Sequence, residues 1–215
     1  KSVTITDYKT IETATLRRCA DFFERQLIVN LDNINMWIAG GCFRAYFSKD
    51  EQIQDIDLFF PSSKEAALCL RSLRRIGFKH FFSNKNAIKG FIENKGNRVY
   101  IDIVKKYYES EEKSLEDFDF SVSKFAYNPR SKTFFHSEYA FTDLLAKRIV
   151  IPDVNFGNPL GSLKRLQKYI KKGYTACNGT LLTIAKRISE MDLTNSEEND
   201  IEFYPDGRVR ILPFD

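Results

Sequence analysis

The sequence is poor in the residues that usually mark a zinc site or a histidine-based catalyst. It has four cysteines, far apart and without Cys-x-x-Cys spacing: Cys19, Cys42, Cys69 and Cys177. A zinc site is therefore not expected, and scattered cysteines in apolar surroundings are typical of reduced, buried thiols in a cytosolic protein. The two histidines, His80 and His136, lie among phenylalanines. Any catalysis is therefore expected to use carboxylates and a metal rather than a histidine base.

Long hydrophobic runs are also missing. No apolar run reaches the roughly 18 residues that a membrane-spanning helix needs, so no membrane partner is expected. The first residues lack the pattern of a signal peptide, which favours a cytoplasmic location. Of the 215 residues, 43% are hydrophobic and 29% are charged, which is typical of an ordinary globular chain. The formal net charge of +4 permits a polyanionic partner without requiring one.

The hydrophobic pattern predicts an α+β fold with a mainly helical second part. Apolar spacing indicates strands and helices in alternation through the first part, with candidate strands at 36–39, 53–60, 78–82, 87–92 and 98–104. Helical patterns then dominate, at 138–147, 160–172 and 181–191. We therefore expect a small mixed β-sheet flanked by helices over residues 1–130, a helical lobe over 131–193 and a C-terminal tail over 194–215.

The chemistry-bearing residues of the first part are two glycines and two aspartates. Gly40 and Gly41 stand between a predicted strand and helix, where glycine lets the backbone approach a ligand and aim N–H groups at an anion. Asp55 and Asp57 head the next strand, and side chains at i and i+2 point to the same face. Each feature alone is better explained by a tight turn or a solvated strand end. Together they predict a site for a triphosphate and a divalent cation, Mg²⁺ or Mn²⁺.

Two further residues are candidates for the same site. Asp102 is a lone charge in an apolar strand, which needs a reason. It either completes the metal site or forms an ion pair with a nearby lysine or arginine, and both alternatives stay open. Arg44 lies one helical turn after the glycines. It is placed either to reach phosphate or to pair with Asp55 or Asp57.

A family resemblance rests on these residues and on the motifs that follow them. Gly40-Gly41-Cys42-Phe43-Arg44 with Asp55-Ile56-Asp57 resembles the GGxxR…DxD signature of the DNA polymerase β-type nucleotidyltransferase superfamily. The nearest group within it is that of the tRNA CCA-adding enzymes and bacterial poly(A) polymerases. Residues 119–128 resemble the RRDFTINALAYN motif of that group, residues 143–149 its DLxxxxI segment, and residues 159–174 its DPLRLLRAIRFAAKLGF helix. The likeness spans residues 36–175.

The resemblance implies the transfer of a nucleoside monophosphate from a nucleoside triphosphate to a hydroxyl acceptor. Asp55, Asp57 and Asp102 would be the catalytic and metal-binding carboxylates. Asp119, in the second motif, would contribute to nucleotide binding together with the glycine turn. The acceptor would be an RNA 3′ end, that of tRNA included, or a protein side chain.

Departures from the family pattern narrow this expectation. The two arginines that precede the DFT of the family are Asp117 and Phe118 here. The Glu-Asp and Arg that choose the incoming base in CCA-adding enzymes fall on Gly157, Asn158 and Gly161. The short tail has no room for the C-terminal domains with which the family holds tRNA. The resemblance therefore argues against CCA addition, and neither base choice nor acceptor can be carried over.

The predicted helix at 160–172 offers a basic face. Lys164 and Lys168 follow i, i+4 spacing and share one side, with Tyr169 and Tyr174 nearby in the sequence. Such a face suits an RNA backbone or a triphosphate, but a solvated helix surface is the better explanation for most of its charges. We keep Lys164 and Lys168 as nucleotide-binding candidates.

Three functional hypotheses follow. The first is an active nucleotidyltransferase. The second is a catalytically idle nucleotide-binding or interaction module, which the lost arginines favour and the intact Asp55 and Asp57 disfavour. The third is a small toxin or phage-type effector that modifies tRNA or a host protein, which fits the size of the chain.

Overall fold

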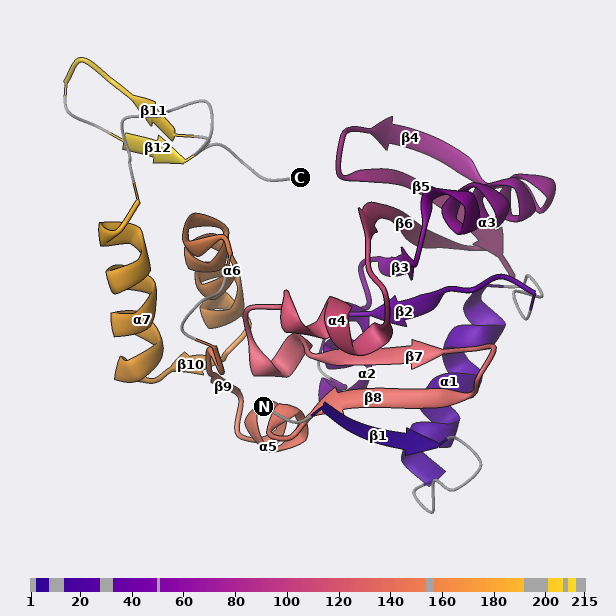
Figure 1. Ribbon diagram of the computed structural model, residues 1–215, viewed down its shortest axis with the longest axis horizontal. Helices are drawn as coiled ribbons and strands as arrows, with labels where there is room; N and C mark the ends of the chain where they lie inside the picture. Colours follow the sequence, from indigo (N-terminus) through magenta and orange to yellow (C-terminus); the bar gives the residue numbers. More distant parts are fainter. Residues whose placement is uncertain are drawn as a thin grey trace.

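The fold is built on one eight-stranded mixed sheet (Figure 1). The computed structural model describes residues 3–7, 14–27, 33–49, 51–153, 157–191, 201–206 and 209–211. The strand order is β1-β8-β7-β2-β3-β6-β5-β4. Only β3 and β6 pair in parallel within this sheet, and its other neighbours are antiparallel. The strands are β1 (Val3–Asp7), β2 (Trp37–Ala39), β3 (Ile56–Phe60), β4 (Lys79–Ser83), β5 (Ala87–Asn94), β6 (Asn97–Tyr107), β7 (Phe125–Asn128) and β8 (Thr133–Ser137).

One face of the sheet carries the main core. Helices α1 (Ala14–Leu27), α2 (Gly41–Ser48) and α3 (Ser63–Arg75) bury their apolar sides against it. Alternate strand residues, such as Ile56 and Leu58 of β3, point into this core. The intervening residues of the same strand, Asp57 and Phe59, therefore lie on the opposite face. This alternation is what places carboxylates on a face that the main core does not fill.

The opposite face has a smaller cover. Helix α4 (Glu111–Glu116) packs there through Leu115, over Trp37, Ala126 and Phe135. The indole N–H of Trp37 donates to Ser114 Oγ at 2.9 Å, and the Lys124 ammonium donates to the carbonyl oxygen of Leu115 at 2.6 Å. These bonds hold α4 against the sheet. The residues that follow α4, Asp117 and Phe118, therefore lie beside Asp57.

The second part of the chain is mainly helical. A 3₁₀ turn, η1 (Ser121–Ser123), precedes β7, and after β8 come α5 (Ala140–Leu145), β9 (Arg148–Ile149), α6 (Pro159–Lys171), β10 (Thr175–Ala176) and α7 (Asn178–Ser189). Helix α6 begins with proline in its first turn, and the Asn158 side chain accepts from the N–H of Gly161 at 2.8 Å. Helices α6 and α7 pack on each other beside the sheet (Figure 1). The last strands, β11 (Ile201–Phe203) and β12 (Val209–Ile211), form a hairpin.

The predicted α+β class is confirmed. The sheet extends further than the expected small sheet, because β8 lies beyond residue 130 and pairs with β7. The predicted helix at 138–147 is the shorter α5, and the predicted helices at 160–172 and 181–191 correspond to α6 and α7. Among the described residues, no helix is both long enough and apolar enough to cross a membrane.

Candidate active site

The glycine turn lies directly beside the aspartates of β3. Gly40 has a φ of +94°, and its N–H donates to the carbonyl oxygen of Phe125 at 2.9 Å. A Cβ at this position would lie 2.9 Å from the Phe118 ring and 3.6 Å from Asp57 Oδ2. The backbone therefore approaches both side chains as closely as glycine alone permits. Gly41 opens α2 at the same point, so the start of a helix faces the carboxylates.

The sheet register brings the aspartates together. Asp57 pairs with Ala39 on β2 and with Asp102 on β6, and directly opposite residues share a face. Asp55, partly buried, lies two residues before Asp57. Burial and the nearby charges of Asp55 and Asp102 raise the pKa of Asp57 well above its ordinary value. The site thus concentrates negative charge that a cation would relieve.

Asp102 has a protein partner. Lys89 on β5 faces it in the register, and the Lys89 ammonium lies 3.1 Å from Asp102 Oδ2. Of the two alternatives for this buried carboxylate, the structure shows the ion pair, and it also places Asp102 next to Asp57. Burial raises the pKa of Asp102, while the lysine opposes this shift.

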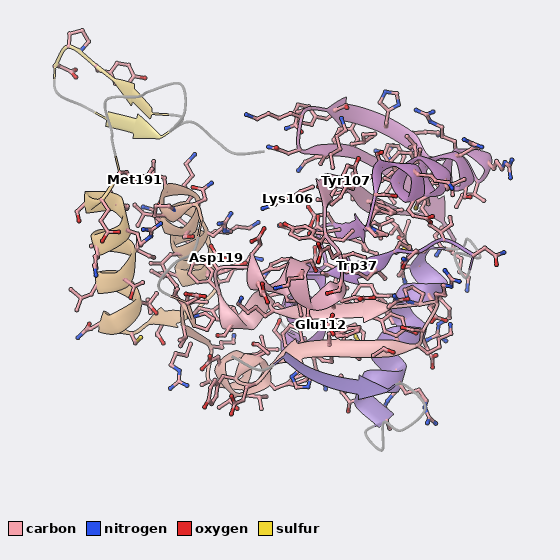
Figure 2. The ribbon with its side chains drawn as sticks, in the orientation of Figure 1. Trp37, Lys106, Tyr107, Glu112, Asp119 and Met191 are labelled. Carbon is pink, nitrogen blue, oxygen red and sulfur yellow. The ribbon has the colours of Figure 1, made fainter. Side chains whose placement is uncertain are left out.

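A cavity of about 360 Å³ opens over these groups. Its floor includes Gly41, Asp55 and Asp57, and its far wall comes from α6. Figure 2 places Asp119 between the sheet and α6, where it lines the same cavity. The remaining lining residues are Cys42, Arg44, Ala45, Gln52, Gln54, Phe59, Tyr108, Asp117, Phe118, Ser123, Arg165, Lys168, Tyr169 and Lys172.

Arg44 lines this cavity but is paired with a residue that the sequence did not suggest. Its guanidinium donates from one nitrogen to both carboxylate oxygens of Glu51, at 2.8 and 2.6 Å. It also lies over the rings of Tyr169 and Tyr174, at 4.4 and 5.9 Å from their centroids. The expected pairing with Asp55 or Asp57 is therefore replaced by a pairing with Glu51. The two tyrosines are buried around this arginine and do not form an exposed surface with it.

Asp119 acts as a junction between the sheet and α6. One of its oxygens accepts from the N–H of Phe120 at 2.9 Å, and the other accepts from Ser162 Oγ at 2.7 Å and Arg165 Nε at 2.8 Å. With its carboxylate occupied by these donors, Asp119 holds Arg165 at the cavity wall. Arg165 was not among the predicted site residues, although it follows Lys164 directly.

The basic helix faces the cavity with a different set of cations from the predicted one. Lys168 lines it, and its ammonium donates to Gln54 Oε1 at 3.2 Å. Lys172, one turn later, also lines it and donates to Glu51 at 2.7 Å. Lys164, one turn before Lys168 on the same side of α6, is not among the lining residues, so of the two predicted lysines only Lys168 lines the cavity. Burial and the neighbouring charge of Lys172 lower the pKa of Lys168.

The residues that replace the family's arginines also line the cavity. Phe118 packs against Phe59 with ring centroids 5.8 Å apart, and Asp117 accepts from Tyr108 Oη at 2.9 Å and pairs with Lys106. Together they form an aromatic and acidic wall where the family motif has two positive charges. The comparison with the family motif marked these positions only as losses, so their own contribution to the cavity was not predicted.

Asp55 and Asp57 suit a magnesium ion by the chemistry of their donor oxygens. Burial, and then repulsion from Asp55 and Asp102, raise the pKa of Asp57. Mg²⁺ is bound in proteins by one or two carboxylates together with substrate phosphates. No group of three or more His, Cys, Asp or Glu side chains in the described part of the chain has the spacing of a complete metal cage.

The model of the "Gabija anti-defense 2 family protein" matches residues 10–147, more than half of the chain. This chain belongs to the Gabija anti-defense 2 family. A curated relative from Bacillus phage SPbetaL7, named "Gabija anti-defense 2", is 25% identical over 178 residues. The match covers 82% of this chain and 43% of that protein, so the chain spans less than half of its relative.

Solved CCA-adding enzymes share the fold of this Gabija anti-defense 2 family member. The Thermotoga maritima enzyme complexed with tRNA superposes with a TM-score of 0.57 at 17% identity, over 86% of this chain and 46% of that one. A CCA-adding enzyme in complex with ATP gives a TM-score of 0.60 at 16% identity, over 88% and 48%. At this identity the likeness shows a nucleotidyltransferase fold, which confirms the superfamily resemblance at the level of the fold.

Proposed function

We propose that this chain is a metal-dependent nucleotidyltransferase that moves a nucleoside monophosphate from a nucleoside triphosphate to a hydroxyl acceptor. The observation that carries the proposal is the position of Asp55 and Asp57 beside the Gly40–Gly41 turn, on the floor of a cavity with a cationic wall. Phosphoryl transfer needs N–H donors for phosphates, and carboxylates that hold metal ions near the reacting oxygens. These parts lie together here.

The chain's own residues would divide the work as follows. The start of α2 at Gly41 would receive phosphate oxygens, and Arg165 and Lys168 would balance their charge from the opposite wall. Asp55 and Asp57 would hold a divalent ion, which supplies charge neutralisation at the triphosphate when bound. The acceptor oxygen would form a bond to the α-phosphorus as pyrophosphate leaves, and a carboxylate such as Asp102 would take the acceptor's proton.

The family name suggests where this activity is used. The relative from the Bacillus phage carries the name "Gabija anti-defense 2". We place this chain in the same role, as a protein that counteracts the Gabija defence by nucleotide transfer. The acceptor is then an RNA or protein of the infected cell rather than the end of a maturing tRNA. The residues that select the base in CCA addition are replaced here by Gly157, Asn158 and Gly161.

A catalytically idle nucleotide-binding module is the second candidate, and two pairings favour it. Arg44 is held by Glu51 and Asp102 by Lys89, so the charge of each is already balanced by a protein partner. Asp117 and Phe118 also replace two positive charges of the family motif. Such a module would bind a nucleotide and act through binding alone.

Pyrophosphate release separates the two candidates. Each nucleoside triphosphate is incubated with the protein, Mg²⁺ and extract, and pyrophosphate release and label transfer are both measured. We expect wild type to transfer label with at least one nucleotide, and the Asp55→Ala/Asp57→Ala variant to transfer none. Glu109→Ala, an exposed carboxylate outside the cavity, is the control and should match wild type. Equal activity in the double variant would reject the site, and nucleotide binding without turnover in wild type would favour the idle module.

A further inference from the structure

The face of the sheet that carries Asp57 continues beyond the site towards the β4 edge. Helix α4 covers this face over β2, β7 and β8. Towards β4 the same face carries exposed aromatic side chains: Phe81 is 60% exposed and Tyr100 is 39% exposed. Large apolar side chains that gather on an exposed surface mark an interaction site more often than single ones do.

The sheet register connects this surface to the carboxylates. Asp102 and Lys89 face each other, and two residues along each strand Tyr100 faces Phe91. Residues two apart on a strand share a face, so Tyr100 and Phe91 lie on the side of Asp102 and Asp57. The next pair on this face is Arg98 with Glu93. A row of side chains therefore leads from the active site along β5 and β6.

Three aromatic rings and an arginine gather in this row, which we name the β4–β6 track (Phe81, Phe91, Arg98, Tyr100). The Tyr100 ring contacts the rings of Phe81 and Phe91, with centroids 6.2 and 5.9 Å apart. The Arg98 guanidinium lies 4.6 Å from the centroid of Phe91. Lys79 approaches the same ring from β4, at 5.8 Å, and its ammonium also lies 3.4 Å from Glu93 Oε1, in an exposed pair.

A hollow joins the track to the active site. A second cavity of about 590 Å³ has Arg98 and Tyr100 in its lining. It shares Gln52, Gln54 and Lys172 with the cavity over Asp55 and Asp57. The two hollows are therefore neighbours, and only the side chains of Gln52, Gln54 and Lys172 stand between a ligand on Tyr100 and the cavity over the carboxylates.

We propose that the β4–β6 track binds single-stranded nucleic acid and delivers its terminal hydroxyl to Asp55 and Asp57. Bases stack on Phe81 and Tyr100, and the backbone phosphates lie near Arg98 and Lys79. Proteins that bind single strands combine aromatic platforms for bases with cations that follow the backbone. The claim that the bound nucleic acid is the acceptor rests on the proposed nucleotide transfer. The claim that the track binds single-stranded nucleic acid does not depend on it.

The edge geometry favours a nucleic acid over an added protein strand. The pairing of β4 with β5 is broken by a register shift between His80 and Phe82. A bulge and a lysine on an edge strand are devices that prevent another strand from pairing there. The aromatic face, rather than the backbone edge, is therefore the binding surface.

Fluorescence anisotropy tests the track with labelled single-stranded RNA and DNA of about 12 nucleotides. We expect Phe81→Ala, Tyr100→Ala and Arg98→Ala each to weaken binding by about tenfold. Tyr139→Ala and Arg74→Ala are matched controls, since these exposed residues lie outside the track, and they should bind like wild type. Binding of ATP with Mg²⁺, measured by calorimetry on the same variants, should stay unchanged and shows that each variant is folded.

The outcomes separate this proposal from the proposed function. The track proposal is overturned if wild type binds no single-stranded nucleic acid, or if the track variants bind it as well as the controls do. Either result counts even if nucleotide transfer is active. Weakened binding in the track variants supports the track even if no label is transferred, in which case only the proposed function fails. Asp55→Asn/Asp57→Asn should keep strand binding and lose transfer.

Discussion

At the scale of single residues, Gly40 is constrained by both its backbone and its neighbours. We predict that Gly40→Ala lowers the free energy of unfolding by about 1–3 kcal/mol, because its positive φ is strained for alanine. The added methyl would also lie 2.9 Å from the Phe118 ring. Gly96→Ala is the control, because Gly96 has a φ of +82° but nothing within 4 Å of the added carbon. Urea unfolding measures both, and equal losses would show that the contact with Phe118 costs nothing.

Asp57 makes the stability of the metal-free protein depend on pH. Its pKa is near its ordinary value of 3.8 in the unfolded chain, and burial with neighbouring carboxylates raises it well above that in the fold. Between these two values the folded protein binds more protons than the unfolded one, so the free energy of unfolding falls as the pH rises. We predict that Asp57→Asn removes this fall. Urea unfolding in EDTA from about pH 4 upward measures it, and an unchanged slope in the variant would contradict the prediction.

At the scale of elements, Glu51 joins α2 to α6. It accepts from Arg44 on α2, from the Lys172 ammonium at 2.7 Å and from Tyr174 Oη at 2.9 Å. The Arg44 and Glu51 side chains are each only 6% exposed. Removing one member of a buried pair leaves the other charge without compensation.

We therefore predict that Glu51→Ala lowers the free energy of unfolding by about 3–5 kcal/mol. The double variant Arg44→Met/Glu51→Ala should recover part of this loss, because no buried guanidinium is then left unpaired. Glu190→Ala is the control: its pair with Arg187 is exposed, and such pairs contribute about 1 kcal/mol or less. Thermal and urea unfolding measure all three, and a loss in Glu51→Ala no larger than the control's would reject the role of Glu51.

Local sequence patterns predicted the strands that carry the carboxylates. The contacts that were not predicted join residues for which no local pattern gives a signal. That Asp55 and Asp57 lie together could be predicted, because strand alternation is a property of neighbouring residues, and both line the cavity. The partner of Arg44 was not found, because Glu51 lies seven residues later, beyond the end of α2, where no helical or strand period pairs the two positions. The other partners of Glu51, Lys172 and Tyr174, lie far away in sequence and meet it only when α6 docks. Helical spacing gave the residues of α6 that share a side, but not which side faces the cavity.

At the scale of the whole molecule, the two parts of the chain close one cavity between them. The sheet supplies the acidic floor and α6 supplies Arg165 and Lys168. Residues on the two walls are joined directly, as by the bond from Lys168 to Gln54 at 3.2 Å. The sequence predicted both parts, but the closure depends on tertiary packing that no local pattern records. A nucleotide bound here would therefore contact both parts and stabilise their docking.

This arrangement predicts that ATP with Mg²⁺ raises the thermal unfolding midpoint. A ligand at a hundred times its Kd adds about 2.7 kcal/mol, which for a chain of this size corresponds to roughly 5–10 °C. Asp55→Asn/Asp57→Asn should show little shift, because the cation that links carboxylates and phosphates is no longer held. ATP in EDTA is the matched control for wild type and should behave like the double variant. A full shift in EDTA would mean that the nucleotide binds without the carboxylates, through the α6 cations alone.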